Sequence, residues 1–414
     1  MKSMLKWACR LALAAATLYG VQSLAANPID AAEARRLHER MLVLDTHLDA
    51  PANFVKPGWN VTDRHAFGDD GSQVDLPRMI EGGLDGGFWA IYTGQGPRTP
   101  QGFATARDTA LLRALSIHQI VARYPQQFEL ALTSADAARI AAQGKRVVYL
   151  SIENGYPLGL DASLLKTFHS LGVRLFGPVH FRNNDLADSA TDPAKEWHGL
   201  SPLGKQLVAE ANRLGIVLDA SHASDDVLDQ LIELSRTPVM LSHSGCKAVF
   251  DHPRNIDDER LRKLAGSGGV IQMNSLGAYL KQIPPNPQRD RALAELTAKY
   301  GPAANLAADK AAELRQARRA IEQQYPVERA TFEDFMKHLL HALRLVGPEH
   351  VGIGADWDGG GGVIGMDDIT ALPKITARLL QEGYSAADIE KIWSGNALRV
   401  LKAAEDYAKH AGTE

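Results

Sequence analysis

Five residues of metal-binding types stand just after short apolar runs. They are His47, Asp49, Glu153, His222 and His243. Three imidazoles and two carboxylates are the nitrogen and oxygen donors that Zn²⁺ and similar ions accept. Five donors exceed the need of one open catalytic zinc, and a shared carboxylate can hold two ions roughly 3.5–4 Å apart. The set predicts a binuclear site, with Glu153 as the bridge because it lies between the other pairs along the chain.

Eight apolar runs, each followed by a helical pattern, position these residues. We expect buried strands at 41–45, 87–92, 147–152, 173–179, 216–220, 238–242, 270–273 and 351–355. Runs without alternation are typical of strands buried on both faces of a parallel sheet. Eight strand–helix units predict an α/β fold of the (β/α)8 TIM-barrel type, in which the carboxyl ends of the strands carry the active site. His47 and Asp49, two residues apart, would share one face there.

An open doubly wound sheet is the alternative fold, but no glycine-rich nucleotide-binding motif follows the first run. Residues 281–329 interrupt the strand–helix rhythm with a proline-rich start and a charged helical stretch. We therefore expect an inserted helical arm between the seventh and eighth strands of a single domain, 26–414.

The first 25 residues have the character of a secretory signal peptide. Lys2, Lys6 and Arg10 precede a short apolar stretch, and small residues follow near position 25. The expected location is the periplasm or cell envelope of a bacterium, with no membrane span after signal removal. Cys9 would leave with the signal, so Cys246 could form no internal disulfide. The formal net charge of −4, made more negative by signal removal, argues against a nucleic-acid partner.

Several motifs together resemble the renal (membrane) dipeptidase family. They are Leu-Asp-Thr-His-Leu-Asp at 44–49, Ser-Ile-Glu-Asn-Gly at 151–155, Asp-Ala-Ser-His-Ala-Ser at 219–224, Leu-Ser-His-Ser at 241–244, His-Pro-Arg-Asn at 252–255 and Gly-Ile-Gly-Ala-Asp-Trp-Asp-Gly at 352–359. The motifs occur in the family's order, and the resemblance extends from about residue 42 to residue 400. It implies a zinc metallodipeptidase of the amidohydrolase-like barrel superfamily.

The resemblance also implies roles for the metal-binding residues. His47 and Asp49 match the ligands of one Zn²⁺, His222 and His243 those of the other, and Glu153 the bridge between them. A hydroxide between the two ions would attack the peptide bond, so no serine or cysteine nucleophile is needed.

Three further residues match family positions that contact the substrate. His180 would stabilise the developing oxyanion, Arg254 would hold the free carboxylate, and Asp356 would transfer the proton. The expected catalytic residues are thus Asp356, His180 and Glu153. The expected substrate-binding residues are Arg254, His180 and Asp356. The substrates implied are dipeptides, including those with a D-residue at the carboxyl end, and a homodimer is the implied assembly.

This chain departs from the family at two places that border the substrate. The segment around His180 reads Pro-Val-His-Phe-Arg-Asn-Asn at 178–184 instead of a Thr-His-Ser type, and four glycines stand at 359–362. Asp358 lies close enough to Asp356 to be confused with it. His338 and His341 share a helix face but lack a third ligand, so we expect them to lie outside the site.

Two other functions remain open from the residues alone. One is another binuclear amidohydrolase or lactonase, in which a modified lysine bridges the ions. The other is a metal- or peptide-binding envelope protein without turnover, against which the proton-transfer residue Asp356 argues.

Overall fold

The computed structural model describes residues 30–301 and 308–411. The expected signal peptide, residues 1–25, lies outside these ranges. Within them, no helix combines the length and the apolar character needed to cross a membrane.

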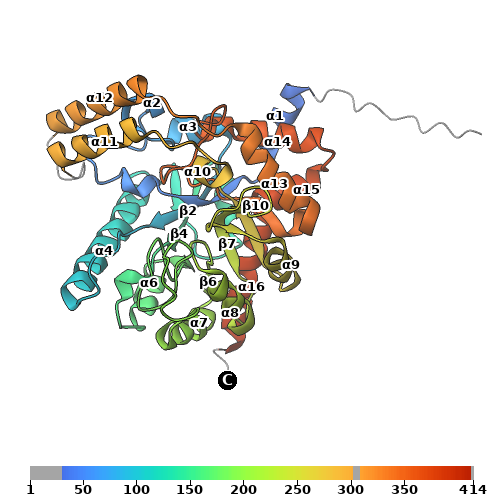
Figure 1. Ribbon diagram of the computed structural model, residues 1–414. Coiled ribbons are helices and arrows are strands. Elements are labelled where there is room, and N and C mark those ends of the chain that lie inside the picture. Colours follow the sequence, from blue (N-terminus) through green and yellow to red (C-terminus); the bar gives the residue numbers. More distant parts are fainter. Residues whose placement is uncertain (1–29, 302–307, 412–414) are drawn as a thin grey trace, which may run out of the picture.

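Parallel strands form two curved sheets at the centre of the molecule (Figure 1). The first sheet has the order β1-β2-β4-β5-β6, with β3 on β4, and the second has the order β10-β9-β7-β8. Their bounds are β1 Leu44–Leu48, β2 Gly86–Ile91, β3 Phe128–Leu130, β4 Arg146–Ile152, β5 Val173–Phe176, β6 Val217–Leu218, β7 Met240–Cys246, β8 Asn255–Ile256, β9 Val270–Met273 and β10 Val351–Ile353.

Isolated parallel bridges join the two sheets at both junctions. Asp219, directly after β6, pairs with Met240, the first residue of β7. Leu48, the last residue of β1, pairs with Trp357, which follows β10. Eight strands, β1, β2, β4, β5, β6, β7, β9 and β10, therefore follow one another in chain order around a closed barrel. This confirms the expected (β/α)8 class.

The strands are buried on both faces because helices cover the barrel (Figure 1). Every residue of β1, β2, β7 and β9 is buried. The helices are α1 Ala31–Arg40, α2 Phe67–Asp70, α3 Leu76–Gly82, α4 Pro100–Arg123, α5 Asp136–Ala141, α6 Leu164–Ser170, α7 Pro202–Leu214, α8 Asp225–Leu234, α9 Asp258–Gly266, α10 Gly277–Leu280, α11 Pro287–Tyr300, α12 Ala308–Gln324, α13 Phe332–Val346, α14 Leu372–Gln381, α15 Ala386–Glu390 and α16 Asn396–Ala411.

Several helices begin at residues whose side chains cap the first turn. Ser201, Ser224 and Asp257 accept hydrogen bonds from the third residue after each of them, at the starts of α7, α8 and α9. These caps fix where each helix starts, and hence the length of the loop that joins it to the preceding strand.

The inserted arm consists of α11 and α12, which follow β9 and precede the barrel helix α13. The two helices pack against each other beside α2 (Figure 1). Arg319 of α12 donates to the carbonyl oxygen of Asp69 in α2 at 2.5 Å. The arm therefore rests on the long segment between β1 and β2, as an addition to the barrel and not as part of its wall.

Candidate active site

Four imidazoles converge on one carboxylate oxygen at the carboxyl-terminal mouth of the barrel. The distances from Glu153 Oε1 to the Nε2 atoms are 3.2 Å for His222, 3.3 Å for His180, 3.6 Å for His243 and 3.7 Å for His47. All five side chains are buried. The barrel thus brings together residues that the chain keeps far apart.

The two remaining acids of the expected site adjoin His47. Asp49 Oδ2 lies 3.2 Å from His47 Nε2. His47, Asp49 and Asp356 place one potential ligand atom each within 4.8 Å of one another. Further donor groups with the same spacing are His47–Glu153–His243 and Glu153–His180–His222.

The donors come from several strand ends, with small differences from expectation. His47 and His243 lie inside β1 and β7, because both strands continue past the apolar runs that predicted them. Glu153 directly follows β4. His222 and Asp356 follow shortened strands, and each adopts a left-handed φ of 66°. Such a backbone conformation is uncommon outside glycine and turns each side chain into the mouth at a sharp bend.

Electrostatic interactions within the cluster hold Glu153 ionised. Burial favours its neutral form, but the charges of His47 and His180 outweigh burial and hold the pKa of Glu153 well below its ordinary value. For His47, burial is likewise outweighed by the charges of Glu153 and Asp49, which raise its pKa to about 10. The carboxylates therefore stabilise positive charge at the centre of the cluster.

His222 and His243 behave in the opposite way. Burial, followed by repulsion from neighbouring cationic groups that include Arg254, lowers both pKa values well below 6.5. Both imidazoles are therefore neutral and keep a lone pair, as metal binding requires.

Unpartnered nitrogens show that the cluster fits divalent ions. Both ring nitrogens of His47 and Nδ1 of His222 are buried without a hydrogen-bond partner among the described residues. Buried polar groups are nearly always partnered, so such atoms require a ligand or ordered water. Three imidazoles and two carboxylates in this arrangement match the donor preference of Zn²⁺.

Buried aspartates that sequence reasoning did not select orient the ligands. Asp219 accepts from Ser242 N and Ser242 Oγ, at 2.9 and 2.5 Å, and Ser242 Oγ lies 2.9 Å from His243 Nδ1. Asp45 accepts from the backbone of His47 and of Ala355, which ties β1 to the end of β10. The signal was present in the sequence, since an aspartate precedes His47 by two residues and His222 by three.

Arg254 reaches the cluster from the loop after β7. The side chain is 3% exposed, and Nη2 donates to the carbonyl oxygen of His243 at 2.9 Å. Its guanidinium lies over the ring of Tyr279, 5.3 Å from the centroid. Arg254 Nε is buried and has no partner within the described part of the chain. A cation with a spare donor beside the cluster suits recognition of an anionic group.

A cavity of about 270 Å³ opens over the cluster around Glu153. Its polar lining consists of Asp49, Glu153, His180, His222, Asp356 and Asp358. Asp356 Oδ2 accepts from Asn274 Nδ2 at 3.3 Å, and burial raises the pKa of Asp356 to about 8. The cavity accommodates a small molecule and brings it next to a carboxyl group whose pKa is raised by burial.

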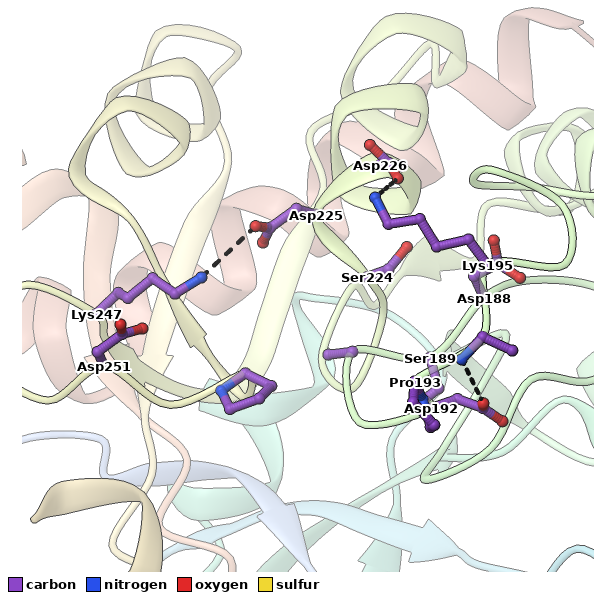
Figure 2. A pocket seen from close by; sticks show the side chains of 13 residues that line it. Asp188, Ser189, Asp192, Pro193, Lys195, Ser224, Asp225, Asp226, Lys247 and Asp251 are labelled. Carbon is purple, nitrogen blue, oxygen red and sulfur yellow. Dashed lines mark hydrogen bonds and ion pairs between the residues drawn. The ribbon is translucent and has the colours of Figure 1, made fainter. Parts of the chain in front are cut away.

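A separate surface hollow lies between the loop after β5 and the start of α8 (Figure 2). Its lysines are paired with acids of α8: Lys195 Nζ lies 2.8 Å from Asp226, and Lys247 Nζ lies 3.7 Å from Asp225. These ion pairs fasten the loops that carry His180 and Arg254 to α8.

His338, His341 and Cys246 belong to none of the donor groups found among the described residues. His338 Nδ1 accepts from the backbone N–H of Cys246 at 3.0 Å, and His341 pairs with Asp258 at 2.7 Å. Burial raises the pKa of the Cys246 thiol to about 12, which favours the thiol over the nucleophilic thiolate.

Comparisons with known proteins agree with this geometry. A model of the membrane dipeptidase family (peptidase family M19) matches residues 31–414. Dipeptidase tcpJ of Claviceps purpurea is 31% identical over 341 residues, which cover 81% of this chain and 70% of that protein. The crystal structure of the probable dipeptidase PvdM from Pseudomonas aeruginosa aligns with a TM-score of 0.78 at 33% identity, covering 91% of this chain and 99% of the other. A metallopeptidase of Rhodobacter sphaeroides, solved with a phosphinate mimic of L-Ala-D-Ala, has a TM-score of 0.69 at 26% identity and covers 88% and 99%.

A (β/α)8 barrel with imidazoles and carboxylates gathered at its mouth is characteristic of metal-dependent hydrolases. The match to the family model over residues 31–414 narrows this class of hydrolases to one family. The chain belongs to the membrane dipeptidase family, peptidase family M19, and is a metal-dependent dipeptidase.

Proposed function

We propose that the protein holds two Zn²⁺ ions and hydrolyses the peptide bond of dipeptides. His47 and Asp49 bind one ion, His222 and His243 bind the other, and Glu153 is shared. The observation that carries this assignment is the convergence of these imidazoles on Glu153 Oε1, at 3.2 to 3.7 Å. Bound there, the ions supply an activated water as nucleophile and polarise the scissile carbonyl.

The protein's own residues bind the substrate and move the proton. Asp356 takes a proton from the attacking water and passes it to the leaving amine, a role that its burial beside the cluster supports, because burial raises the pKa of the carboxyl group and makes the carboxylate a stronger base. His180, whose Nε2 lies 3.3 Å from Glu153 Oε1 at the centre of the cluster, would donate a hydrogen bond to the carbonyl oxygen as negative charge develops on it.

Arg254 limits the substrate to short peptides with a free carboxylate. Its buried, unpartnered Nε supports a charge-assisted hydrogen bond to that group. The Rhodobacter relative was solved with a mimic of L-Ala-D-Ala, which supports including L-Xaa-D-Xaa dipeptides among the substrates.

A panel of L,L and L,D dipeptides, their carboxyl-amidated forms and a set of lactones tests this function on the zinc-loaded protein. We expect turnover of free dipeptides and little turnover of amidated ones. Hydrolysis of lactones alone would favour another amidohydrolase activity. A protein that retains zinc but hydrolyses none of the panel would favour a binding role and contradict the proposal.

We further propose that residues 1–25 direct export. A fusion of this segment to a reporter that is active only outside the cytoplasm tests this, and a reporter retained in the cytoplasm would contradict it.

A further inference from the structure

Phe181 is an exposed aromatic residue placed directly against the catalytic cluster. Its side chain is 47% exposed and lines the cavity above the cluster. Its ring centroid lies 3.9 Å from that of His180 and 5.1 Å from that of His222, at 73° to the latter ring. An apolar ring left in contact with water loses the stabilisation that burial would provide. A ligand that covers Phe181 would recover part of it.

The loop after β5 holds Phe181 in this position. Ser189 Oγ donates to the carbonyl oxygen of His180 at 2.5 Å, and Thr191 Oγ1 donates to that of Phe181 at 3.0 Å. Further along, the pair between Lys195 and Asp226 fastens the same loop to α8 (Figure 2). These contacts restrict the backbone that carries the phenyl ring, which lowers the entropic cost of binding to it.

Other apolar side chains line the same cavity. They are Ala52, Tyr92, Leu276 and Tyr279. Tyr92 also packs on His180, with ring centroids 4.9 Å apart. The cavity thus has a charged side around the donor cluster and an apolar side, the arrangement that binds a polar backbone and an apolar side chain together.

Charge around the mouth orients a dipeptide in this cavity. Arg254, in the loop after β7, stacks on Tyr279, which lines the cavity, so the guanidinium attracts the carboxylate of the substrate to this side. Phe181 follows β5 and touches His222, which follows β6, and the next strand in barrel order is β7, the strand before Arg254. The carboxyl-terminal residue of the substrate therefore lies on the side of Phe181.

We propose that Phe181 forms an apolar subsite for the side chain of the carboxyl-terminal residue, so that the enzyme favours dipeptides ending in an apolar or aromatic residue. This inference rests on the proposed dipeptidase function. It assigns a binding role to Phe181 and no part in bond cleavage.

Steady-state kinetics of the zinc-loaded protein and its Phe181→Ala variant test the subsite. The substrates are Gly-Gly, Leu-Gly, Gly-Leu and Gly-Phe. We expect Phe181→Ala to raise KM for Gly-Leu and Gly-Phe about tenfold with kcat unchanged, and to leave Gly-Gly and Leu-Gly within about twofold. Phe181→Leu should restore most of the affinity for Gly-Leu. Phe67→Ala, at a 40% exposed phenylalanine on α2, is the matched control and should change none of these values.

Two results would overturn the inference while leaving the dipeptidase function intact. One is an equal change for all four substrates, which would mean that Phe181 only supports the loop. The other is a change confined to Leu-Gly, which would place the amino-terminal side chain on Phe181. If the unchanged protein hydrolyses no dipeptide, the proposed function fails, and the subsite fails with it.

Discussion

His222 Nε2 lies 2.9 Å from His243 Nε2, the spacing of a hydrogen bond between two nitrogens that both face Glu153. Burial lowers the pKa of both rings well below 6.5, so neither favours the protonated form. Two lone pairs at this distance repel each other unless a proton or a cation lies between or beside them. This contact supports the proposal that both rings bind one ion.

Arg254→Ala should raise KM for dipeptides by roughly 10- to 100-fold, the effect of losing one charge-assisted hydrogen bond, with kcat nearly unchanged. The reason is that Arg254 Nε has no partner among residues 30–301 and 308–411 and can bind the substrate carboxylate. Steady-state kinetics on a free dipeptide and on its carboxyl-amidated form separate the two effects. An equal rise in KM for both substrates would mean that Arg254 only supports His243.

Asp356→Asn should lower kcat by about 10²- to 10⁴-fold, the usual range for loss of a general acid–base group, while zinc content and KM stay close to normal. Asp358→Asn is the matched control, because both residues line the cavity and both have a φ of 66°. Asp358 Oδ1 accepts from the backbone of Gln73 at 2.6 Å, a bond that asparagine retains. A larger loss of kcat in Asp358→Asn would exchange the two assignments.

The stability of the protein should fall as the pH falls from 7 to 5, in part because of His38. This residue is fully buried in α1, where Nε2 contacts the carbonyl oxygen of Gly82 at 3.0 Å and Nδ1 contacts Thr376 Oγ1 at 2.7 Å. Burial lowers the pKa of His38 to about 4. Because the unfolded state takes up a proton near pH 6.5 and the folded state only near pH 4, His38 contributes stability above pH 6.5 that is lost towards pH 4, about 2 kcal/mol of it between pH 7 and pH 5.

Urea unfolding with a chelator present, at pH 7 and pH 5, measures this loss. His38→Asn should be less stable at pH 7 but less sensitive to pH. His338, whose pKa burial also lowers to about 4, leaves part of the pH dependence in the variant. A variant with the same pH dependence as the unchanged protein would contradict the role of His38.

Much of the barrel could be predicted because each buried strand leaves an apolar run in the sequence. All eight expected strands are present, although β1 and β7 extend through His47 and His243, where polar ligands end the apolar pattern. The short strands β3 and β8 were not predicted. With three and two residues, they are too short to show a periodic pattern and form because a neighbouring strand offers free backbone groups.

The donor cluster could be predicted as a set of residue types, but not its supporting contacts. The stacking of Arg254 on Tyr279 and the hydrogen bonds from Ser242 to Asp219 depend on how loops from different strands meet. Such contacts join residues far apart in the chain and cannot be predicted from the periodicity of the sequence. The exposure of Phe181 likewise became apparent only from the position of its ring above His180 and His222.

Zinc content and dipeptide turnover, measured on the same samples of the unchanged protein and of Glu153→Gln, test the binuclear site most directly. Glu210→Gln on the outer helix α7 is the control and should behave like the unchanged protein. We predict two zinc ions per chain and active hydrolysis in the unchanged protein, and loss of zinc together with loss of hydrolysis in Glu153→Gln, because the shared carboxylate faces every imidazole of the cluster. A Glu153→Gln protein that keeps two zinc ions and full activity would contradict the account.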